Sequence, residues 1–227
     1  MADEGALTTG ITASELRPLA PEFYLRRADE VAPELLGRFL IRGARGRRAV
    51  GRIVEVEAYL GADDPASHAA GGRRTARTET MYRRGGVAYV YLIYGLHHCL
   101  NVVCGPSDEA QAVLVRAIEP VDGLEWMIAN RGIGPEPRPG DVGGGPGKLC
   151  QALAIDRSLD GVSLLDGELV LGEGRPAPPE ELVRGPRIGV DYAGEAAAWP
   201  LRFAVADHRH MSRPIMRGRP GRYNRRS

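Results

Sequence analysis

Residues 49–60 read AVGRIVEVEAYL, and this stretch decides the fold class because its side chains alternate with a period of two. One face of the predicted strand is apolar and consists of Val54, Val56 and Ala58. The other face is mostly acidic and aromatic and consists of Ile53, Glu55, Glu57 and Tyr59. The alternation therefore predicts a strand with one face in the core, and it places Glu57 beside Tyr59.

A second β-rich region follows at residues 87–104. The runs VAYVYLIY (87–94) and HHCLNVVC (97–104) are joined by Gly95-Leu96, a two-residue connection that fits a type II′ hairpin turn. This hairpin would carry Tyr94 at its tip.

The remaining periodic segments predict scattered helices among further strands. Apolar spacing predicts a helix over 29–40 with Asp29 as N-cap, and further helices over 122–131 and 146–155. Further strands are predicted over 110–117, with Arg116 on the face of Leu114 and Ala112, and over 187–190 and 201–205. Asp166-Gly167 indicates a hairpin between 162–165 and 168–171. We expect an α+β single domain with a curved, mostly antiparallel β-sheet and surrounding helices.

Domain limits follow from composition. Residues 1–18 are small and polar, which predicts a disordered N-terminal arm, and residues 208–227 form a basic C-terminal tail. One folded domain is expected over 19–207. Within it, the loop 61–86 is long enough to be a binding loop, and the Gly- and Pro-rich segment 132–147 predicts a flexible loop.

The overall composition indicates a folded cytoplasmic protein. The chain has 227 residues, 30 basic against 29 acidic residues, and 43% hydrophobic residues. No apolar run is long enough to span a membrane, and the N-terminus does not resemble an export signal. Cys99, Cys104 and Cys150 are too few for a disulfide framework, so we expect them to be buried apolar residues.

Positive charge is concentrated in two places. Residues 73–84 contain Arg73, Arg74, Arg77, Arg83 and Arg84 against Glu79, and seven arginines follow Asp207 with no acid among them. Such local excess is typical of a surface that binds phosphates, although charge alone is equally consistent with a solvated surface.

Three familiar kinds of site fit poorly. A Walker phosphate loop around segment 143–149 would need Gly at position 142 and Ser or Thr at position 149. The chain has Val142 and Leu149 there. Because side chains alternate along a strand, we expect Cys99 and Cys104 to lie on opposite faces. The spacing of the Cys and His residues does not fit a zinc site either, so no metal is expected. Ser67-His68 lacks the G-x-S-x-G nucleophile elbow.

The carboxylate of Glu57 is the remaining candidate centre. An acid in a strand is commonly exposed, but the polar and aromatic residues near Glu57 along the sequence favour a site. Five of the eight tyrosines fall between residues 59 and 94. The residues that we group with Glu57 are Tyr59, His68, Tyr89, Tyr91, Tyr94, Asn101 and Arg116.

Four strings carry a resemblance to a known family. They are GRIVEVEAYLGADDPASHAAGGRRTART (51–78), AYVYLIYGLHHCLNVV (88–103), AVLVRAIEP (112–120) and GPGKLCQALAI (145–155). In this order they resemble the 3-methyladenine DNA glycosylases of the alkyladenine type, from about Pro21 to Asp207. The loop Met81–Gly86 departs from the Met-Phe-Gly-Pro-Pro-Gly that the family usually has there.

The resemblance implies a repair enzyme that flips damaged purines out of duplex DNA. It implies that Glu57 activates water and that Arg116 holds Glu57 and the water in place. It further implies that Tyr59, His68, Tyr91 and Asn101 line the base pocket and that Tyr94 fills the gap left by the flipped nucleotide. Arg73, Arg74, Arg77 and Lys148 are candidates for contacts with the DNA backbone.

The chemistry of the residues agrees with this reading. Cleavage of an N-glycosidic bond passes through an oxocarbenium-like sugar, which a carboxylate stabilises, and Arg116 favours the ionised form of that carboxylate. Aromatic faces favour a cationic alkylated purine. Lys148 is the only lysine, so we expect base removal by water, without a lyase step or cofactor, by a monomer acting on damaged DNA.

Two other functions remain open on sequence grounds. A nucleic-acid-binding module without chemistry could use the same curved sheet and basic segments. A hydrolase of free nucleosides would need no basic loops, and salt would not weaken its activity as it weakens that of a DNA enzyme.

Overall fold

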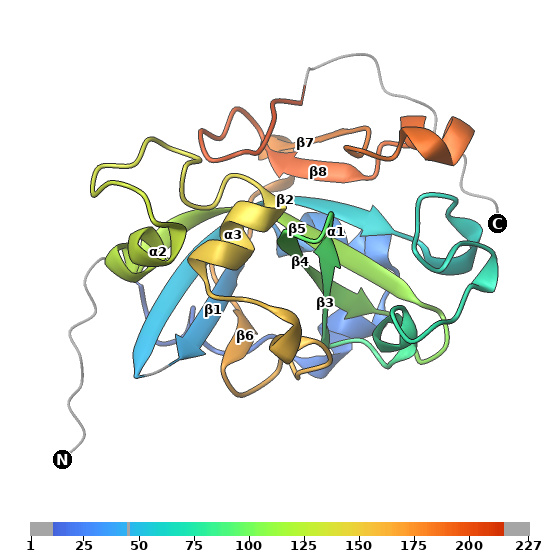
Figure 1. Ribbon diagram of the computed structural model, residues 1–227, viewed down its shortest axis with the longest axis horizontal. Coiled ribbons are helices and arrows are strands. Elements are labelled where there is room, and N and C mark those ends of the chain that lie inside the picture. The colour runs from blue at the N-terminus through green and yellow to red at the C-terminus, as the bar shows by residue number, and fades with distance from the viewer. Residues whose placement is uncertain (1–10, 45, 216–227) are drawn as a thin grey trace.

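One antiparallel sheet organises the protein. The computed structural model describes residues 11–44 and 46–215, and in these ranges eight strands form a single sheet with the order β3-β4-β5-β2-β1-β6, in which β8 pairs with β2 and β7 (Figure 1). The strands are β1 (Phe39–Ala44), β2 (Arg47–Tyr59), β3 (Ala88–Ile93), β4 (His97–Cys104), β5 (Gln111–Asp122), β6 (Leu169–Gly172), β7 (Leu182–Gly185) and β8 (Arg202–Val205). The predicted α+β class with a curved antiparallel sheet is confirmed.

Strand β2 is the centre of this sheet because it pairs with three neighbours. Its first half pairs with β1, residues 50–59 pair with β5, and residues 55–57 pair with β8. The sheet therefore divides at β2 into a β1–β6 arm and a β8–β7 arm, and it curves around the middle of β2.

Three α-helices cover the sheet: α1 (Ala28–Leu35), α2 (Leu124–Arg131) and α3 (Pro146–Ala152). Helix α3 packs on β4 and β5, α1 packs on β2 and β5, and α2 packs on α3. The main core joins residues of all three helices to the alternate residues Val56, Ala58, Val113 and Val115 of β2 and β5. Short 3-10 turns lie at Pro21–Leu25, Gly61–Asp63, Ala70–Gly72, Glu79–Tyr82, Arg157–Leu159, Pro179–Glu181 and Asp191–Ala198.

The opposite face of β3, β4, β5 and β2 carries polar and aromatic side chains. Cross-strand pairing aligns one residue from each of five strands in a single row: Tyr89, Asn101, Leu114, Glu57 and Arg202. Directly opposed residues of an antiparallel pair project to the same face of the sheet. Period-two alternation thus separates the apolar core from a row of functional side chains.

Two of the three irregularities in the β2–β5 ladder lie next to this row and adjust it. The pairing steps from Ile53↔Ile118 to Glu55↔Ala117, and then to Val56↔Val115. One residue is extra on each strand in turn, which is the pattern of a β-bulge and changes the direction of nearby side chains. For this reason Ile53 lies in the main core instead of sharing the face of Glu55, as the uniform alternation had predicted.

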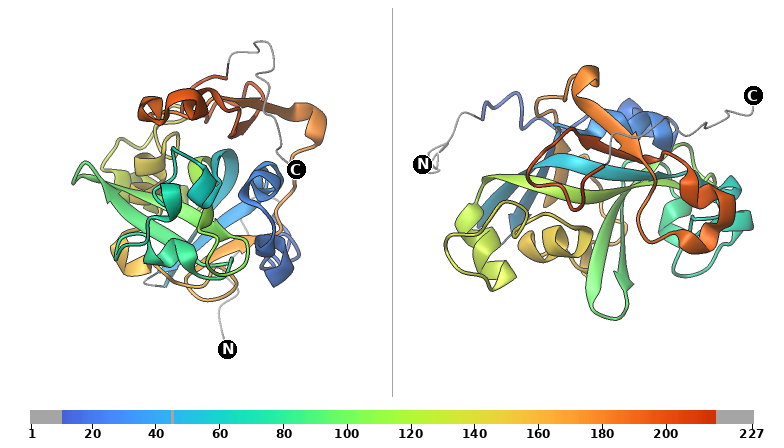
Figure 2. Two further views of the ribbon diagram at one scale, coloured as in Figure 1. Left: turned by 90° about the vertical axis from the view of Figure 1, so that its right-hand side faces the viewer. Right: turned by 90° about the horizontal axis from the view of Figure 1, so that it is seen from above.

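The β3–β4 hairpin projects from the body of the protein (Figure 2, green). Its turn differs from the predicted type II′ connection, because Ile93 pairs with His97 and three residues lie between them. The Leu96 amide donates to the Ile93 carbonyl at 3.1 Å, and Tyr94 and Gly95 have φ values of 53° and 67°. Positive φ at both central positions is the geometry of a type I′ turn, with Tyr94 at the tip.

The predicted helix over 29–40 is wrong in its second half. Helix α1 ends at Leu35 with Arg27, not Asp29, as the N-cap residue, and Phe39 begins β1. Gly37, with a φ of 86°, lies so close to the Arg175 carbonyl that a Cβ at this position would clash with it. The apolar side chains of residues 36–40 are buried, but by a turn and a strand. Their spacing along the sequence resembles that of a helix, which explains the wrong prediction.

Other boundaries also differ from the prediction. Strand β5 continues to Asp122, α2 begins after Gly123, and α3 ends at Ala152. Segment 162–165 is not a strand: β6 pairs with β1 instead, and Ser163 bridges Val87. Segment 187–190 is also not a strand, since Gly189 turns the chain with a φ of 76°.

The two ends of the described chain contact the domain. Of the expected N-terminal arm, residues 1–10 lie outside the described residues, whereas Ile11 is buried against Phe39 and Glu15 pairs with Arg175. Of the expected tail, residues 216–227 lie outside the described residues, whereas the Ser212 amide donates to Glu55 at 2.6 Å. In the described part of the chain, no helix has the length and hydropathy needed to cross a bilayer.

The packing of α3 on the sheet gives a test of the fold. Leu149 is fully buried in the main core, whereas Leu124 of α2 is 43% exposed. We expect Leu149→Ala to lower the free energy of unfolding by about 2–5 kcal/mol, because it leaves a cavity in a packed core. The matched Leu124→Ala should cost less than about 1 kcal/mol. Urea unfolding of both variants measures this, and equal losses would contradict the assigned core.

Candidate active site

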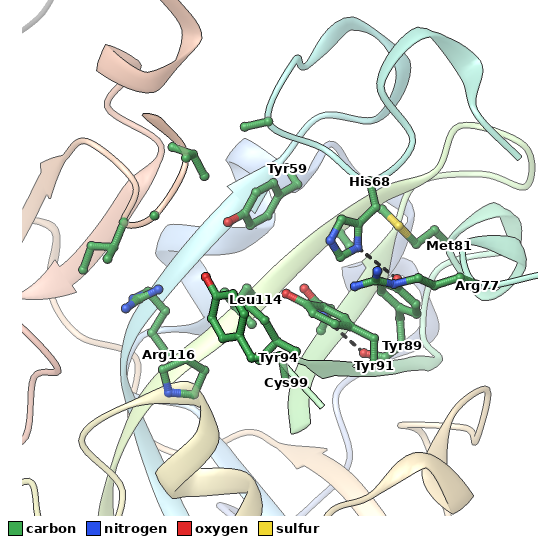
Figure 3. A pocket seen from close by; sticks show the side chains of 18 of the residues that line it. Tyr59, His68, Arg77, Met81, Tyr89, Tyr91, Tyr94, Cys99, Leu114 and Arg116 are labelled. Carbon is green, nitrogen blue, oxygen red and sulfur yellow. Dashed lines mark hydrogen bonds between the residues drawn. The ribbon is translucent and has the colours of Figure 1, made fainter. Parts of the chain in front are cut away.

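A cavity lies over the row of functional side chains. It has a volume of about 270 Å³, and its walls come from β2, β3, β4 and β5 and from two loops, 61–86 and 186–192 (Figure 3). The sequence-predicted residues that line it are Tyr59, His68, Arg77, Tyr89, Tyr91, Tyr94, Asn101 and Arg116. The structure therefore brings residues from five separate segments of the chain to one place.

Glu57 lies beneath the lining of this cavity, in contact with three residues that line it, and has no exposed surface. The Tyr59 hydroxyl donates to its Oε2 at 2.9 Å, and the Ile188 amide donates to its Oε1 at 2.7 Å. The Arg116 Nη1 lies 3.2 Å from the same Oε1. All three neighbours line the cavity, so they form the boundary between the carboxylate and the open space.

The protonation states of these neighbours are well defined. Burial raises the pKa of the Tyr59 phenol well above its usual value, and the negative charge of Glu57 raises it further. Burial disfavours the charged form of Arg116, but the Glu57 and Glu55 carboxylates outweigh burial and raise the pKa of the guanidinium. Tyr59 is therefore a neutral donor, and Arg116 is a permanent cation.

Aromatic rings form the wall of the cavity farther from Glu57. The His68 ring packs edge-on to Tyr91 with centroids 4.6 Å apart, and its Nδ1 lies 3.0 Å from the Tyr89 hydroxyl. The Arg77 guanidinium stacks over the Tyr91 ring at 5.1 Å. Burial, with a smaller effect from Arg77, lowers the pKa of His68 to about 4, so its imidazole is neutral at pH 7.

Asn101 and Tyr94 occupy different depths. Asn101 is buried, and its side-chain amide donates to the Tyr89 carbonyl at 3.1 Å. Tyr94 is 85% exposed although it lines the rim of the cavity, because it sits on the tip of the projecting hairpin. A large aromatic side chain with this exposure is available for an external partner.

The four predicted DNA-backbone residues lie in different settings. Arg73 and Arg77 line a second pocket, to which His68 also contributes. Arg74 pairs with Glu79 and Asp108 and stacks on Tyr82. Lys148 donates to the Gly140 carbonyl at 3.1 Å and lies in the first turn of α3.

A buried ion pair that sequence reasoning missed fastens the two loops together. Asp64 accepts hydrogen bonds from both terminal nitrogens of Arg187, and neither side chain has exposed surface. The Arg187 guanidinium also stacks over the Tyr59 ring at 4.8 Å. This pair places Ile188, the next residue, where its amide reaches Glu57.

Three more polar residues surround Arg116 without lining the cavity, and they were also missed as site residues. Glu55 is fully buried and accepts from Arg116 Nε at 3.0 Å, from Arg202 and from Ser212. The face shared by Glu55 and Glu57 was visible in the alternation of β2. By contrast, nothing in the sequence near Arg202 or Ser212 indicates that they meet this strand.

Within the described ranges, no group of three His, Cys, Asp or Glu side chains is arranged to hold a metal ion. Cys99 lines the cavity, and burial raises the pKa of its thiol, so this group is protonated at neutral pH. The chemistry available to the cavity is that of a carboxylate, a guanidinium, phenols and a neutral imidazole.

Comparison with known proteins identifies relatives that span most of the chain. Residues 22–209 match the family described as methylpurine-DNA glycosylase. A protein of Myxococcus xanthus is 49% identical over 88% of this chain and 96% of its own length. Proteins of Clostridium botulinum and Bacillus cereus are 43% and 46% identical over 85% of this chain and 97% and 98% of their own lengths.

All three relatives carry the name "Putative 3-methyladenine DNA glycosylase". The match covers the cavity, the carboxylate and the aromatic walls described above. The resemblance seen in the sequence is therefore confirmed, and the chain belongs to the methylpurine-DNA glycosylase family.

Proposed function

We propose that this protein releases alkylated purines from duplex DNA by hydrolysis of the N-glycosidic bond, with Glu57 activating the water. The family supplies the class of reaction, a DNA glycosylase of base excision repair. The observation that carries the proposal is the fully buried carboxylate held by Arg116, Tyr59 and Ile188, three residues that line an aromatic cavity.

The Oε2 atom of Glu57 has one acceptor position left for a water. A carboxylate oxygen has roughly two lone-pair positions, and within the described residues Oε2 accepts one hydrogen bond, from Tyr59. The other oxygen, Oε1, accepts a hydrogen bond from the Ile188 amide and forms an ion pair with Arg116 Nη1 at 3.2 Å. A water bound at the remaining position of Oε2 would lie next to the Tyr59 hydroxyl. From there it can attack the sugar carbon from which the base departs, while the negative charge of Glu57 stabilises the developing positive charge on the sugar.

The aromatic wall suits a cationic purine. Alkylation at N3 or N7 leaves the base positively charged, and an aromatic face attracts a cation by about 0.5–2 kcal/mol. Tyr59 and Tyr91 remain neutral because burial raises the pKa of both phenols, and His68 is neutral at pH 7. The wall therefore contributes neutral aromatic rings from Tyr59, Tyr91 and His68, and the Arg187 and Arg77 guanidinium groups stack over the two phenol rings. We further propose that the buried Asn101, which lines the cavity, discriminates at the purine edge, including against the 2-amino group of normal guanine.

Base flipping requires a group that replaces the flipped nucleotide. Unstacking a base costs a few kcal/mol, and an inserted side chain recovers part of that cost. Tyr94 is suited to this role because it is exposed, projects on a hairpin and borders the cavity.

Water rather than an amine is the proposed nucleophile. A lyase step uses an amine to form a Schiff base, and Lys148, the only lysine of the chain, is hydrogen-bonded to Gly140 and does not line the cavity. A non-catalytic binding module, the alternative, would have no need of a buried carboxylate in this position. Binding of lesion DNA without an abasic product would favour that alternative.

Replacement of the carboxylate by an amide tests the role of Glu57. Glu57→Gln should lower the single-turnover rate of base release from a duplex with hypoxanthine or 3-methyladenine by about 100-fold or more, since general bases contribute roughly 10²–10⁴. The matched control Glu119→Gln removes a half-buried carboxylate of β5 that pairs with Arg52. The control should retain its rate, and an unaltered rate in Glu57→Gln would overturn the assignment.

The hairpin tip can be tested by a pair of substitutions. Tyr94→Ala should reduce base release from duplex DNA by about 10-fold or more, because nothing then fills the vacated stack. Tyr94→Phe keeps the ring and should remain within about threefold of the original rate. Both replacements keep a Cβ at the positive φ of this position, so backbone strain does not distinguish them. Equal rates for the two variants would argue against insertion.

The state of His68 predicts a dependence of stability on pH. Its pKa is lowered to about 4 in the folded protein, below the usual 6.5, so the unfolded chain binds more protons between these values. The free energy of unfolding should therefore decrease as the pH falls from about 6.5 to about 4. His68→Gln should lack this part of the decrease, as measured by urea unfolding at several pH values. A parallel pH dependence in both proteins would show that His68 titrates normally.

A further inference from the structure

Glu55 accepts four hydrogen bonds from three residues, although it does not line the cavity itself. Its Oε1 accepts from Arg116 Nε at 3.0 Å, Arg202 Nη1 at 3.0 Å and Ser212 Oγ at 2.9 Å. Its Oε2 accepts from the Ser212 amide at 2.6 Å. The side chain has no exposed surface.

The two carboxylates and two guanidinium groups balance in charge. Glu55 and Glu57 contribute two negative charges, and Arg116 and Arg202 contribute two positive charges, all at buried positions. Burying four charges is costly, and an apolar cluster of similar volume would generally be as stable or more stable. The arrangement is therefore better explained by the geometry that it imposes than by stability.

Arg116 connects the two carboxylates. Its Nε contacts Glu55, and its Nη1 contacts Glu57 at 3.2 Å. A guanidinium is planar and rigid, so fixing one edge fixes the direction of the other. Glu55 thus determines where the charge of Arg116 points.

The C-terminal segment of the described chain completes this arrangement. Ser212 Oγ lies 3.2 Å from Arg116 Nη2 as well as donating to Glu55. Arg202 donates to the carbonyls of Arg213 and Pro214 at 3.1 and 3.4 Å. Segment 212–214 therefore contacts Arg116, Glu55 and Arg202 without lining the cavity.

We infer that Glu55 is a positioning residue which, together with Arg202 and Ser212, holds Arg116 in the orientation that contacts Glu57. The inference rests on the proposed role of Glu57. It makes segment 212–214 a structural part of the active site, although none of its residues lines the cavity. Loss of Glu55 should then impair the chemical step and leave the binding of DNA nearly intact.

A double-mutant cycle between Glu55 and Arg116 tests this inference. Glu55→Gln keeps the shape of the side chain and removes its charge, and we expect it to lower the single-turnover rate by about 10- to 100-fold, as loss of a supporting contact commonly does. Its affinity for a duplex with an uncleavable abasic-site analogue should change less than threefold. In an Arg116→Gln background, Glu55→Gln should cost less than about threefold, because its partner is already lost.

Three further variants make the result decisive. Glu15→Gln is a matched control, since Glu15 is buried and paired with Arg175 but lies outside the cavity. This variant should keep the single-turnover rate of the original protein. Ser212→Ala removes one of the two Ser212 donors. It should lower the rate about three- to tenfold in the original background and have no effect in Arg116→Gln. If thermal melting shows that Glu55→Gln is unfolded, Ser212→Ala replaces Glu55→Gln in the cycle. Glu57→Gln is measured in parallel.

Each outcome has a separate meaning. A reduced rate in Glu57→Gln with an unaltered rate in Glu55→Gln and Ser212→Ala would overturn this inference and leave the proposed function standing. An equal loss from Glu55→Gln with and without Arg116 would also overturn it, because independent losses indicate a merely structural role. An unaltered rate in Glu57→Gln would overturn the proposed function itself.

Discussion

The contact between Arg116 and Glu57 is the interaction on which the rest of the structure depends. A carboxylate without exposed surface is stable only if it is paired with a charge or hydrogen-bonded, and here a guanidinium forms an ion pair with it while a phenol and a backbone amide donate to it. Each of these three partners comes from a different element: β5, β2 and the loop that follows β7. Their convergence requires the curved sheet and both loops to be in place at once.

The alternation of the strands explains how one sheet serves both stability and chemistry. Apolar residues of β2–β5 face the helices, and the residues between them form the row from Tyr89 to Arg202. A shift of one residue in the register would move the whole row into the core. Two of the three irregularities between β2 and β5 fall beside Glu55 and Arg116, where side-chain direction matters most.

Much of this arrangement could be predicted from the sequence because it is local. The alternation of residues 49–60 predicts a strand with Glu57 beside Tyr59, and the two runs within 87–104 predict a hairpin. The structure contains this strand, this neighbour pair and this hairpin. The family, and with it the class of reaction, was also recognised from sequence and is confirmed. The roles of individual residues remain predictions that the variants above address.

The features that could not be predicted depend on contacts between distant segments. A period of two carries no information about a bulge, so Ile53 was placed on the wrong face. Segment 187–190 has β-type residues but passes over Glu57 as an irregular loop, held by the Asp64–Arg187 pair. Arg202 and Ser212 meet Glu55 only through tertiary folding.

The most direct test of the central claim is a crystal structure of the protein with duplex DNA that carries an uncleavable analogue of an alkylated purine nucleotide. The account predicts that the analogue's base lies in the cavity against Tyr91 and His68. It also predicts a water bound to Glu57 Oε2 at hydrogen-bond distance and facing the sugar carbon C1′. A base that stays outside the cavity, or a Glu57 with no water between its carboxylate and the sugar, would contradict it.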